Sequence, residues 1–349
     1  MKHNILICGT FDFIGMATGG QPVKTRELYN SLKEDNTNTF VDYLELLSWR
    51  KRPIKILFQF FRKASKADSI IMLPAHNGLF VFSFLLLLAK KLFGCGIYYD
   101  VIGGWLPDLL HTKDFLARCL KKFNGIWVET NTMKKGLEAL GFRNVTVINN
   151  FKHLKPITSY DSINSYKEPY KLCTFSRVMA EKGIGDAVKV VQKINEHYGR
   201  VLFQLDIYGP IDDTYAEEFS KIQCTFGNDI RYMGVRRPED SVEIIKNYFF
   251  LLFPTHFYTE GIPGTIVDAY FAGVPVVSAE WQNSHDVILP NQTGILYPFD
   301  NFNALEETLK MIADNPSFIF EMKGNCIKVA NRYSPSVVIT QIKDILANK

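Results

Sequence analysis

The sequence predicts an α/β protein with two Rossmann-like domains, each a doubly wound parallel sheet, that face each other across a cleft. Its 349 residues are more than one hydrophobic core usually holds, which favours two domains. In each half, short apolar runs alternate with helical patterns, as in parallel sheets wound with helices. A polar stretch at 152–169 separates the halves. We expect domains at 1–160 and 161–333, and a helix in 334–349 that could pack back on the first domain.

Strands are expected where apolar runs are bounded by turn residues, and helices where apolar residues recur with a period of about 3.6. In the first half the strands are expected at 4–9, 38–43, 68–73, 96–102, 124–128 and 144–148, with helices at 22–34, 79–93 and 131–140. In the second half the strands are expected near 171–176, 201–208, 229–233, 248–253, 274–278 and 294–297. Helices are expected there near 183–197, 214–225, 239–246, 264–272 and 302–313.

The composition excludes several classes of function. The net charge of +4 is too small to predict a nucleic-acid partner. The six cysteines are scattered without a C-x-x-C pair, which favours reduced thiols over disulfides or zinc. No Asp-x-Asp motif or His/Asp cluster has metal-site spacing, so we expect neither a metal nor a cofactor. We find no secretory signal, and the apolar run 79–89 is about half of the roughly 20 residues that a spanning helix needs, so we expect a cytoplasmic protein.

The segment 260–269 is the most informative feature of the chain. Glu260 stands in a turn rich in glycine and proline, and Asp268 is expected about two turns into the helix that follows. The first N–H groups of a helix attract anions, and carboxylates bind sugar hydroxyls, so the segment points to a sugar nucleotide. We expect Glu260 to bind the donor sugar, Asp268 the ribose, and the backbone of Gly264 and Thr265 the sugar or phosphate. An acidic helix start favoured by the dipole is the alternative, but it does not explain Asp268 within an apolar helix.

Two loops that follow expected strands add candidate ligand groups. Gly19 and Gly20 follow the first strand and let the backbone approach a phosphate or sugar, while the lack of G-x-G-x-x-G spacing disfavours an NAD site. Arg177 and Lys182 flank the loop after 171–176, where two cations can neutralise a departing diphosphate without a metal. The alternatives are a flexible loop at the glycines and solvated surface charges at the cations.

In this order, the motifs resemble those of the retaining GT-B glycosyltransferases of family four (glycosyl transferases group 1), of the bacterial surface-polysaccharide type. The family's motif of two glutamates with seven residues between them corresponds to Glu260 and Asp268. Its diphosphate-binding Arg and Lys correspond to Arg177 and Lys182, and its N-terminal glycine pair to Gly19-Gly20. The resemblance covers nearly the whole chain and is strongest at 171–300, where 208–209, 272–278 and 293–296 also match.

The resemblance implies a metal-independent hexosyltransferase that moves a sugar from a nucleoside diphosphate to a saccharide acceptor. The acceptor would be lipid-linked, as in capsule or lipopolysaccharide biosynthesis. Arg177, Lys182 and Glu260 would be catalytic, and the departing diphosphate would take the acceptor's proton during attack on the same face. The donor-binding residues would be Gly19, Gly20, Gly264, Thr265 and Asp268. A nucleotide-sugar epimerase of the same fold, or a non-catalytic membrane-recruited binding module, are the alternatives.

Two departures from the family pattern concern the acceptor side and one loop. Many members carry a His after the fourth strand, where this chain reads Asp-Val-Ile-Gly-Gly-Trp at 100–105. The nearest imidazole there is His111, and with His76 and Asp108 it could touch an acceptor sugar; all three could also be ordinary loop residues. The family's Gly-Gly-x-x-Glu loop is replaced by 281–286, so its contacts can differ.

The segment 50–66 carries seven basic residues and no acid. Ile54, Leu57, Phe58 and Phe61 recur at helical spacing and form one apolar side. Such a helix suits an anionic membrane surface, which would make the protein peripheral on the inner face of the plasma membrane. The alternative is an ordinary amphipathic helix that packs on its sheet and leaves a solvated basic face.

Overall fold

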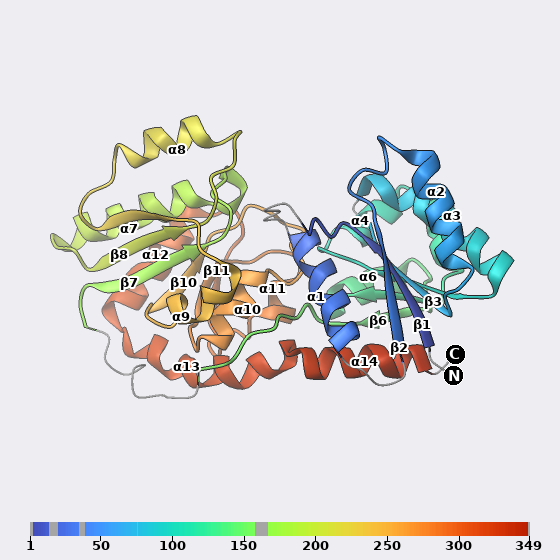
Figure 1. Ribbon diagram of the computed structural model, residues 1–349. Coiled ribbons are helices and arrows are strands. Elements are labelled where there is room, and N and C mark those ends of the chain that lie inside the picture. The colour runs from blue at the N-terminus through green and yellow to red at the C-terminus, as the bar shows by residue number, and fades with distance from the viewer. Residues whose placement is uncertain (1–2, 14–19, 35–38, 75, 158–166, 348–349) are drawn as a thin grey trace. The chain divides into compact units, whose positions relative to one another are not determined.

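The computed structural model describes residues 3–13, 20–34, 39–74, 76–157 and 167–347 (Figure 1). By contact the chain divides into two compact units, one formed by 1–153 with 333–349 and the other by 154–332. Each unit holds a six-stranded parallel sheet surrounded by helices, which confirms the predicted two-domain α/β class. Among the described residues, no helix combines the length and the hydropathy that crossing a bilayer requires.

The sheet of the first unit has the strand order β2-β1-β3-β4-β5-β6. Its strands are β1 (His3–Gly9), β2 (Thr39–Glu45), β3 (Ser69–Leu73), β4 (Gly96–Asp100), β5 (Gly125–Val128) and β6 (Val145–Val147). The central strands are buried along their whole length because helices cover both faces of the sheet. The order of the strands reverses between β1 and β3.

Helices pack on both faces of this first sheet, and successive residues of β1 contact them on alternate faces. Ile5 and Ile7 pack with α1 (Gly20–Glu34) and α14 (Pro335–Ala347), so the C-terminal helix belongs to the core of the first unit. Leu6 and Cys8 pack into the cluster on the opposite face. That face is covered by α2 (Pro53–Ala64), α3 (His76–Phe93), α4 (Leu106–His111), α5 (Asp114–Leu120) and α6 (Asn131–Ala139).

The sheet of the second unit has the order β12-β11-β10-β7-β8-β9, the doubly wound order of dinucleotide-binding folds. Its strands are β7 (Tyr170–Phe175), β8 (Phe203–Tyr208), β9 (Ile230–Gly234), β10 (Phe250–Phe253), β11 (Val276–Ala279) and β12 (Gly294–Tyr297). The α-helices are α7 (Ile184–Tyr198), α8 (Ala216–Gln223), α9 (Ser241–Ile245), α10 (Gly264–Phe271), α11 (Ser284–Val287), α12 (Phe302–Asp314) and α13 (Ser317–Ala330). Short 3₁₀ turns are η1 (Ala180–Lys182), η2 (Pro238–Asp240) and η3 (Asn331–Tyr333).

The strand order of the second sheet reverses between β7 and β10. In open α/β sheets, ligands bind beyond the carboxyl ends of the strands at this switch point. The two loops that begin there are 176–183, after β7, and 254–263, after β10. They contain Arg177, Lys182 and Glu260, which positions these three residues at the edge where a ligand is expected.

Two local expectations differ from the structure. Asp268 lies about one turn into α10, which begins at Gly264 after Pro263, and not two turns into it. The side of α2 that packs on the sheet is formed by Ile56, Phe60 and Ala64 and not by the apolar side that begins at Ile54. The helix therefore packs on its sheet, as the amphipathic alternative for segment 50–66 expects, and Phe61 of the expected apolar side is half-buried against the same core.

Candidate functional site

The loops after β7 and β10 approach each other so closely that Gly183 admits no side chain. Its φ is +67°, and a Cβ added there would lie 1.8 Å from the carbonyl oxygen of Pro254. Backbone contacts join the same two loops, since the His256 amide donates to the Glu181 carbonyl at 2.8 Å. Direct backbone contacts therefore join the two loops at the switch point of the second sheet.

Lys182 and Glu260 are brought together at this point. The Nζ of Lys182 donates to Oε1 of Glu260 in a largely buried ion pair. The ammonium also lies 5.3 Å from the ring centroid of Phe253 and 4.9 Å from that of Phe257, distances at which aromatic faces attract a cation. A carboxylate and two rings therefore position the lysine, and a negatively charged ligand could take the place of the carboxylate.

The backbone of Glu260 is fixed by a residue that sequence reasoning does not identify. The side-chain amide of Asn283 donates to the Glu260 carbonyl at 2.7 Å, and the backbone N–H of Gln282 donates to the Tyr258 carbonyl at 3.0 Å. Both belong to the loop 281–286, where the chain departs from the family pattern. The loop 281–286 thus holds the turn that contains Glu260, although no motif in the loop predicts this role.

The first turn of α10 follows directly after this turn. Pro263 is its N-cap, and Gly264 and Thr265 are its first two residues. The hydroxyl of Thr265 is buried and, among the described residues, has no hydrogen-bond partner. An unpaired buried hydroxyl beside the free N–H groups of a helix start is a favourable environment for an anionic or hydroxyl-rich ligand. Asp268 is only 3% exposed and has a partner within the structure, so its role toward a ribose stays a prediction.

Arg177 lies in the same loop as Lys182 but is directed toward the loop after β8. Its Nη1 is 3.5 Å from Oδ2 of Asp212, a long contact between partly exposed groups. Hydrogen bonds from Thr214 lower the pKa of Asp212, and Arg177 contributes less. Because the Arg177 pair is long and solvated, it holds the guanidinium weakly and leaves it able to turn to another anion.

On the first unit, the structure joins one of the three acceptor-side candidates to an aromatic partner. His76 begins α3, and its ring centroid lies 3.6 Å from that of Trp105, which precedes α4. Burial lowers the pKa of His76, which favours the neutral imidazole. Asp108 and His111 are exposed on α4, and within the described part of the chain no hydrogen bond or ring contact joins them to His76. Of the glycine pair, Gly20 begins α1, while Gly19 lies outside the described residues.

A buried charge cluster follows the neighbouring strands β4 and β5 of the first unit. Lys24 of α1 contacts Asp100 at 2.8 Å and Glu129 at 3.0 Å, and all three side chains are buried. Burial alone would lower the pKa of Lys24, but the two carboxylates outweigh it and raise that pKa. Burial raises the pKa of Asp100 despite the nearby ammonium. Lys24 thus pairs with both carboxylates, while burial opposes ionisation of Asp100.

Comparison with known proteins places sequence similarity in the second unit. Residues 169–315 match a family model described as glycosyl transferases group 1. The amylovoran biosynthesis glycosyltransferase AmsK of Erwinia amylovora is 21% identical over 187 residues, which are 51% of this chain and 45% of that protein. The chain thus spans about half the length of the curated relative it matches.

Solved structures resemble the whole chain. HepE of Anabaena, in complex with UDP and glucose, has a TM-score of 0.75 and 14% identity, with 99% of this chain and 100% of that chain covered. Sucrose-phosphate synthase from Thermosynechococcus elongatus has a TM-score of 0.77 and 13% identity, with 99% and 98% covered. A glycosyltransferase from Rickettsia africae has a TM-score of 0.76 and 14% identity, with both chains fully covered. These likenesses show the fold, and they confirm the predicted GT-B class.

Proposed function

We propose that this chain is a retaining, metal-independent glycosyltransferase of group 1 that transfers a hexosyl group from a nucleoside diphosphate sugar to a saccharide acceptor. The observation that carries the proposal is the arrangement at the switch point of the second sheet. There Lys182 and Glu260 pair, and four residues later α10 begins with the unpartnered hydroxyl of Thr265. A cation, a carboxylate and a helix start suit a ligand that combines phosphates with sugar hydroxyls.

The similarity of residues 169–315 to glycosyl transferases group 1 supports the activity. HepE, which shares the fold, has been solved in complex with UDP and with UDP-glucose, and this supports a nucleotide sugar as donor. AmsK, which acts in amylovoran biosynthesis, supports a role in building a surface polysaccharide such as capsule or lipopolysaccharide. We place the reaction on the cytoplasmic side, at the inner face of the plasma membrane.

In the proposed reaction, an acceptor hydroxyl attacks the anomeric carbon of the donor while the bond from that carbon to the diphosphate breaks. A diphosphate oxygen takes the hydroxyl proton, so the step needs no carboxylate nucleophile and attack on the same face retains the anomeric configuration. Lys182 would exchange Glu260 for the diphosphate, and Arg177 would turn from Asp212 to the same charge. Glu260, released from the lysine, would accept hydrogen bonds from the sugar hydroxyls.

The acceptor side is proposed to involve the pair formed by His76 and Trp105. An indole face binds the apolar face of a sugar ring, and a neutral imidazole can accept a hydrogen bond from a hydroxyl. Asp108 and His111 remain candidates for longer acceptors because both are exposed on α4. A lipid-linked acceptor is favoured by the apolar and basic side chains that α2 presents to solvent.

The proposal is tested with a panel of UDP-, GDP- and ADP-linked hexoses, each incubated with and without saccharide and lipid-linked saccharide acceptors. We expect release of a nucleoside diphosphate that increases with acceptor, and a product with the anomeric configuration of the donor in its NMR spectrum. Conversion of the nucleotide sugar without release would indicate an epimerase. Binding without any turnover across the panel would favour the non-catalytic module and contradict the proposal.

A further inference from the structure

The outer side of α2 exposes large apolar side chains that the fold does not use. Ile54 is 83% exposed and Phe58 is 70% exposed, whereas Ile56 and Phe60 on the opposite side are buried in the core. Exposed apolar side chains are common singly, but a contiguous group on one helix indicates a contact with another molecule or a membrane. From its sequence, only segment 50–66 was expected to make such a contact.

The exposed apolar surface continues over α3 and α5. Phe80, Phe84, Leu88 and Leu92 recur along the outer side of α3, and each is more than one-third exposed. Exposed Phe115 of α5 lies against this row, with ring centroids 5.9 Å from Phe80 and 6.4 Å from Phe84. Figure 1 shows α2 beside α3, and these two helices are also in contact. We call the exposed sides of α2, α3 and α5 the outer helical face.

The charge along α2 and α3 is almost entirely positive, whereas α5 begins with the exposed Asp114. Between residues 46 and 99 the chain carries one acid, Asp68. The basic residues in the same interval are Arg50, Lys51, Arg52, Lys55, Arg62, Lys63, Lys66, Lys90 and Lys91. Bulky apolar groups with a basic border complement a bilayer surface that contains anionic lipids.

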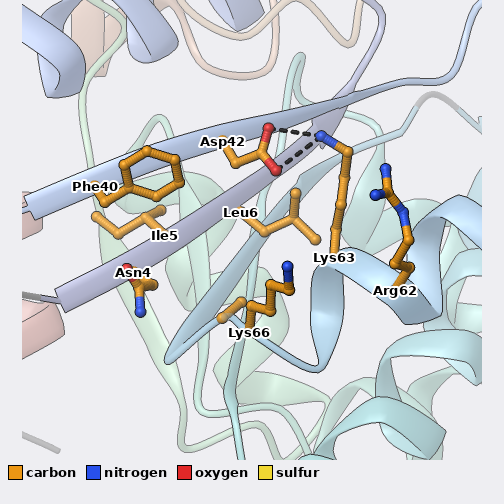
Figure 2. Close-up of a pocket in the computed structure, with 9 residues that line it drawn as sticks. Asn4, Ile5, Leu6, Phe40, Asp42, Arg62, Lys63 and Lys66 are labelled. Atoms are coloured by element: carbon orange, nitrogen blue, oxygen red, sulfur yellow. Dashed lines mark hydrogen bonds and ion pairs between the residues drawn. The ribbon is translucent and has the colours of Figure 1, made fainter.

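A pocket of about 240 Å³ opens at the C-terminal end of α2 (Figure 2). Arg62 and Lys63 line it from the helix, Lys66 from the turn that follows the helix, and Asp42 from β2. Lys63 neutralises Asp42 through contacts of 2.6 and 2.8 Å. No salt bridge occupies Arg62 or Lys66 within the described residues, so the pocket keeps two cations for an anionic group such as a headgroup phosphate.

A second copy of the chain is a poor partner for this surface. An isologous dimer sets the same patch against itself, so the basic border would face an identical basic border. The interval that forms α2 and α3 offers only Asp68 to compensate this repulsion. An anionic bilayer supplies the missing negative charge and also an apolar interior for the phenyl and leucyl side chains.

We propose that the outer helical face is a membrane-docking surface, in which the exposed apolar side chains of α2, α3 and α5 enter an anionic bilayer. Arg62 and Lys66 bind the phosphate of a lipid headgroup in their pocket. The surface begins one turn after His76, the acceptor-side residue that starts α3, so docking brings a lipid-linked acceptor to that residue. This deepens the membrane partner of the proposed function, but binding itself does not require the transfer reaction.

The test is co-flotation with phosphatidylcholine vesicles that either contain or lack phosphatidylglycerol. The wild-type protein is expected to float only with the anionic vesicles. Replacing Phe84 and Leu88 together by Asp is expected to lower partitioning at least about tenfold, because apolar insertion is lost. In the variant with Arg62→Ala and Lys66→Ala, partitioning into the anionic vesicles is expected to fall about fivefold for each charge removed. Val337→Asp, at a 44% exposed apolar position of α14, is the matched control and should float like wild type.

Further measurements distinguish membrane docking from self-association and from the proposed transfer reaction. Lys182→Ala is expected to lose about a hundredfold or more in transfer activity and still float, so failure of the reaction leaves the docking result interpretable. Circular dichroism checks that each variant remains folded. Equal flotation of the Phe84/Leu88 variant and the Val337 control overturns the proposal, as does equal flotation with neutral vesicles. A wild-type dimer that the Phe84/Leu88 variant converts to a monomer, without vesicle binding, assigns the surface to self-association and also overturns it.

Discussion

Lys323 of α13 predicts a pH-dependent stability that can be measured without knowledge of any substrate. Its side chain is 1% exposed, and its Nζ donates to the Tyr248 carbonyl at 3.2 Å. Burial lowers the pKa of Lys323 from 10.5 to about 7. In the unfolded chain the ammonium is solvated and keeps its ordinary pKa. Between these two pKa values the unfolded chain therefore binds a proton that the folded chain does not.

The sign and size of the effect follow from this difference. Stability must rise with pH wherever the unfolded state binds more protons, so this lysine destabilises the fold least above pH 10.5 and most below pH 7. With about 1.4 kcal/mol per pKa unit, its cost is roughly 4 kcal/mol at pH 7 and falls by about 2 kcal/mol at pH 9. Lys323→Met removes the charge and keeps most of the volume. We expect the variant to be more stable than wild type at pH 7. This gap, the difference in stability between the two proteins, should narrow as pH rises.

The assay is differential scanning calorimetry of both proteins from pH 7 to pH 9. At about 2–4 °C of Tm per kcal/mol for a unit of this size, the gap should narrow by roughly 4–8 °C. Lys328→Met is the control, because Lys328 lies on the same helix at an exposed position and should show no narrowing. A gap between wild type and Lys323→Met that stays constant over this range would refute the reasoning. So would a variant less stable than wild type at pH 7, since either result means that Lys323 is charged in the folded protein.

Three further predictions concern the switch point of the second sheet. Lys182→Ala should lower kcat on the order of a hundredfold or more, whereas Lys189→Ala on α7 should retain activity; initial rates of nucleoside diphosphate release measure both. Gly183→Ala should lower Tm and donor affinity more than Gly199→Ala. Both glycines have a positive φ, +67° and +64°, but only at Gly183 would the new Cβ meet a backbone oxygen, at 1.8 Å, while Gly199 faces open space. Equal effects of the two substitutions would mean that strain at φ, and not the contact with Pro254, decides the loss. Activity should survive EDTA, and a loss that Mg²⁺ or Mn²⁺ restores would contradict charge neutralisation by Arg177 and Lys182.

The strands could be read from the sequence because their signal is local. All twelve observed strands lie within two residues of the expected ranges, since buried parallel strands are apolar runs ended by turn residues. The helices with weaker patterns were missed. The helices α4 and α5 are short, and α13 contains Gly324 and Asn325, which are poor helix formers. The packing of α13 against α10 outweighs that local preference.

The candidate site was predictable where its parts share a loop and not where they meet through the fold. Lys182 and Glu260 are each marked by a turn after an apolar run, but only the adjacency of β7 and β10 brings them into contact. Asn283 carries no sequence signal because it binds a backbone carbonyl, and any residue supplies one. The cluster of Lys24, Asp100 and Glu129 did carry a signal. Both acids follow apolar strands, and once β4 and β5 are known to be neighbours their carboxylates must lie close together.

The distribution of similarity along the chain has a chemical explanation. The match to glycosyl transferases group 1 covers 169–315, and the groups that suit a nucleotide sugar, Lys182, Glu260 and Thr265, all lie within it. A nucleoside diphosphate has the same phosphates whichever sugar it carries, so the residues that bind it can share one pattern. The first unit instead carries the pair of His76 and Trp105 and the outer helical face, which suit an acceptor and a membrane. Acceptors differ in their hydroxyls and lipids, so a common sequence pattern is least expected in the unit that we propose to bind them.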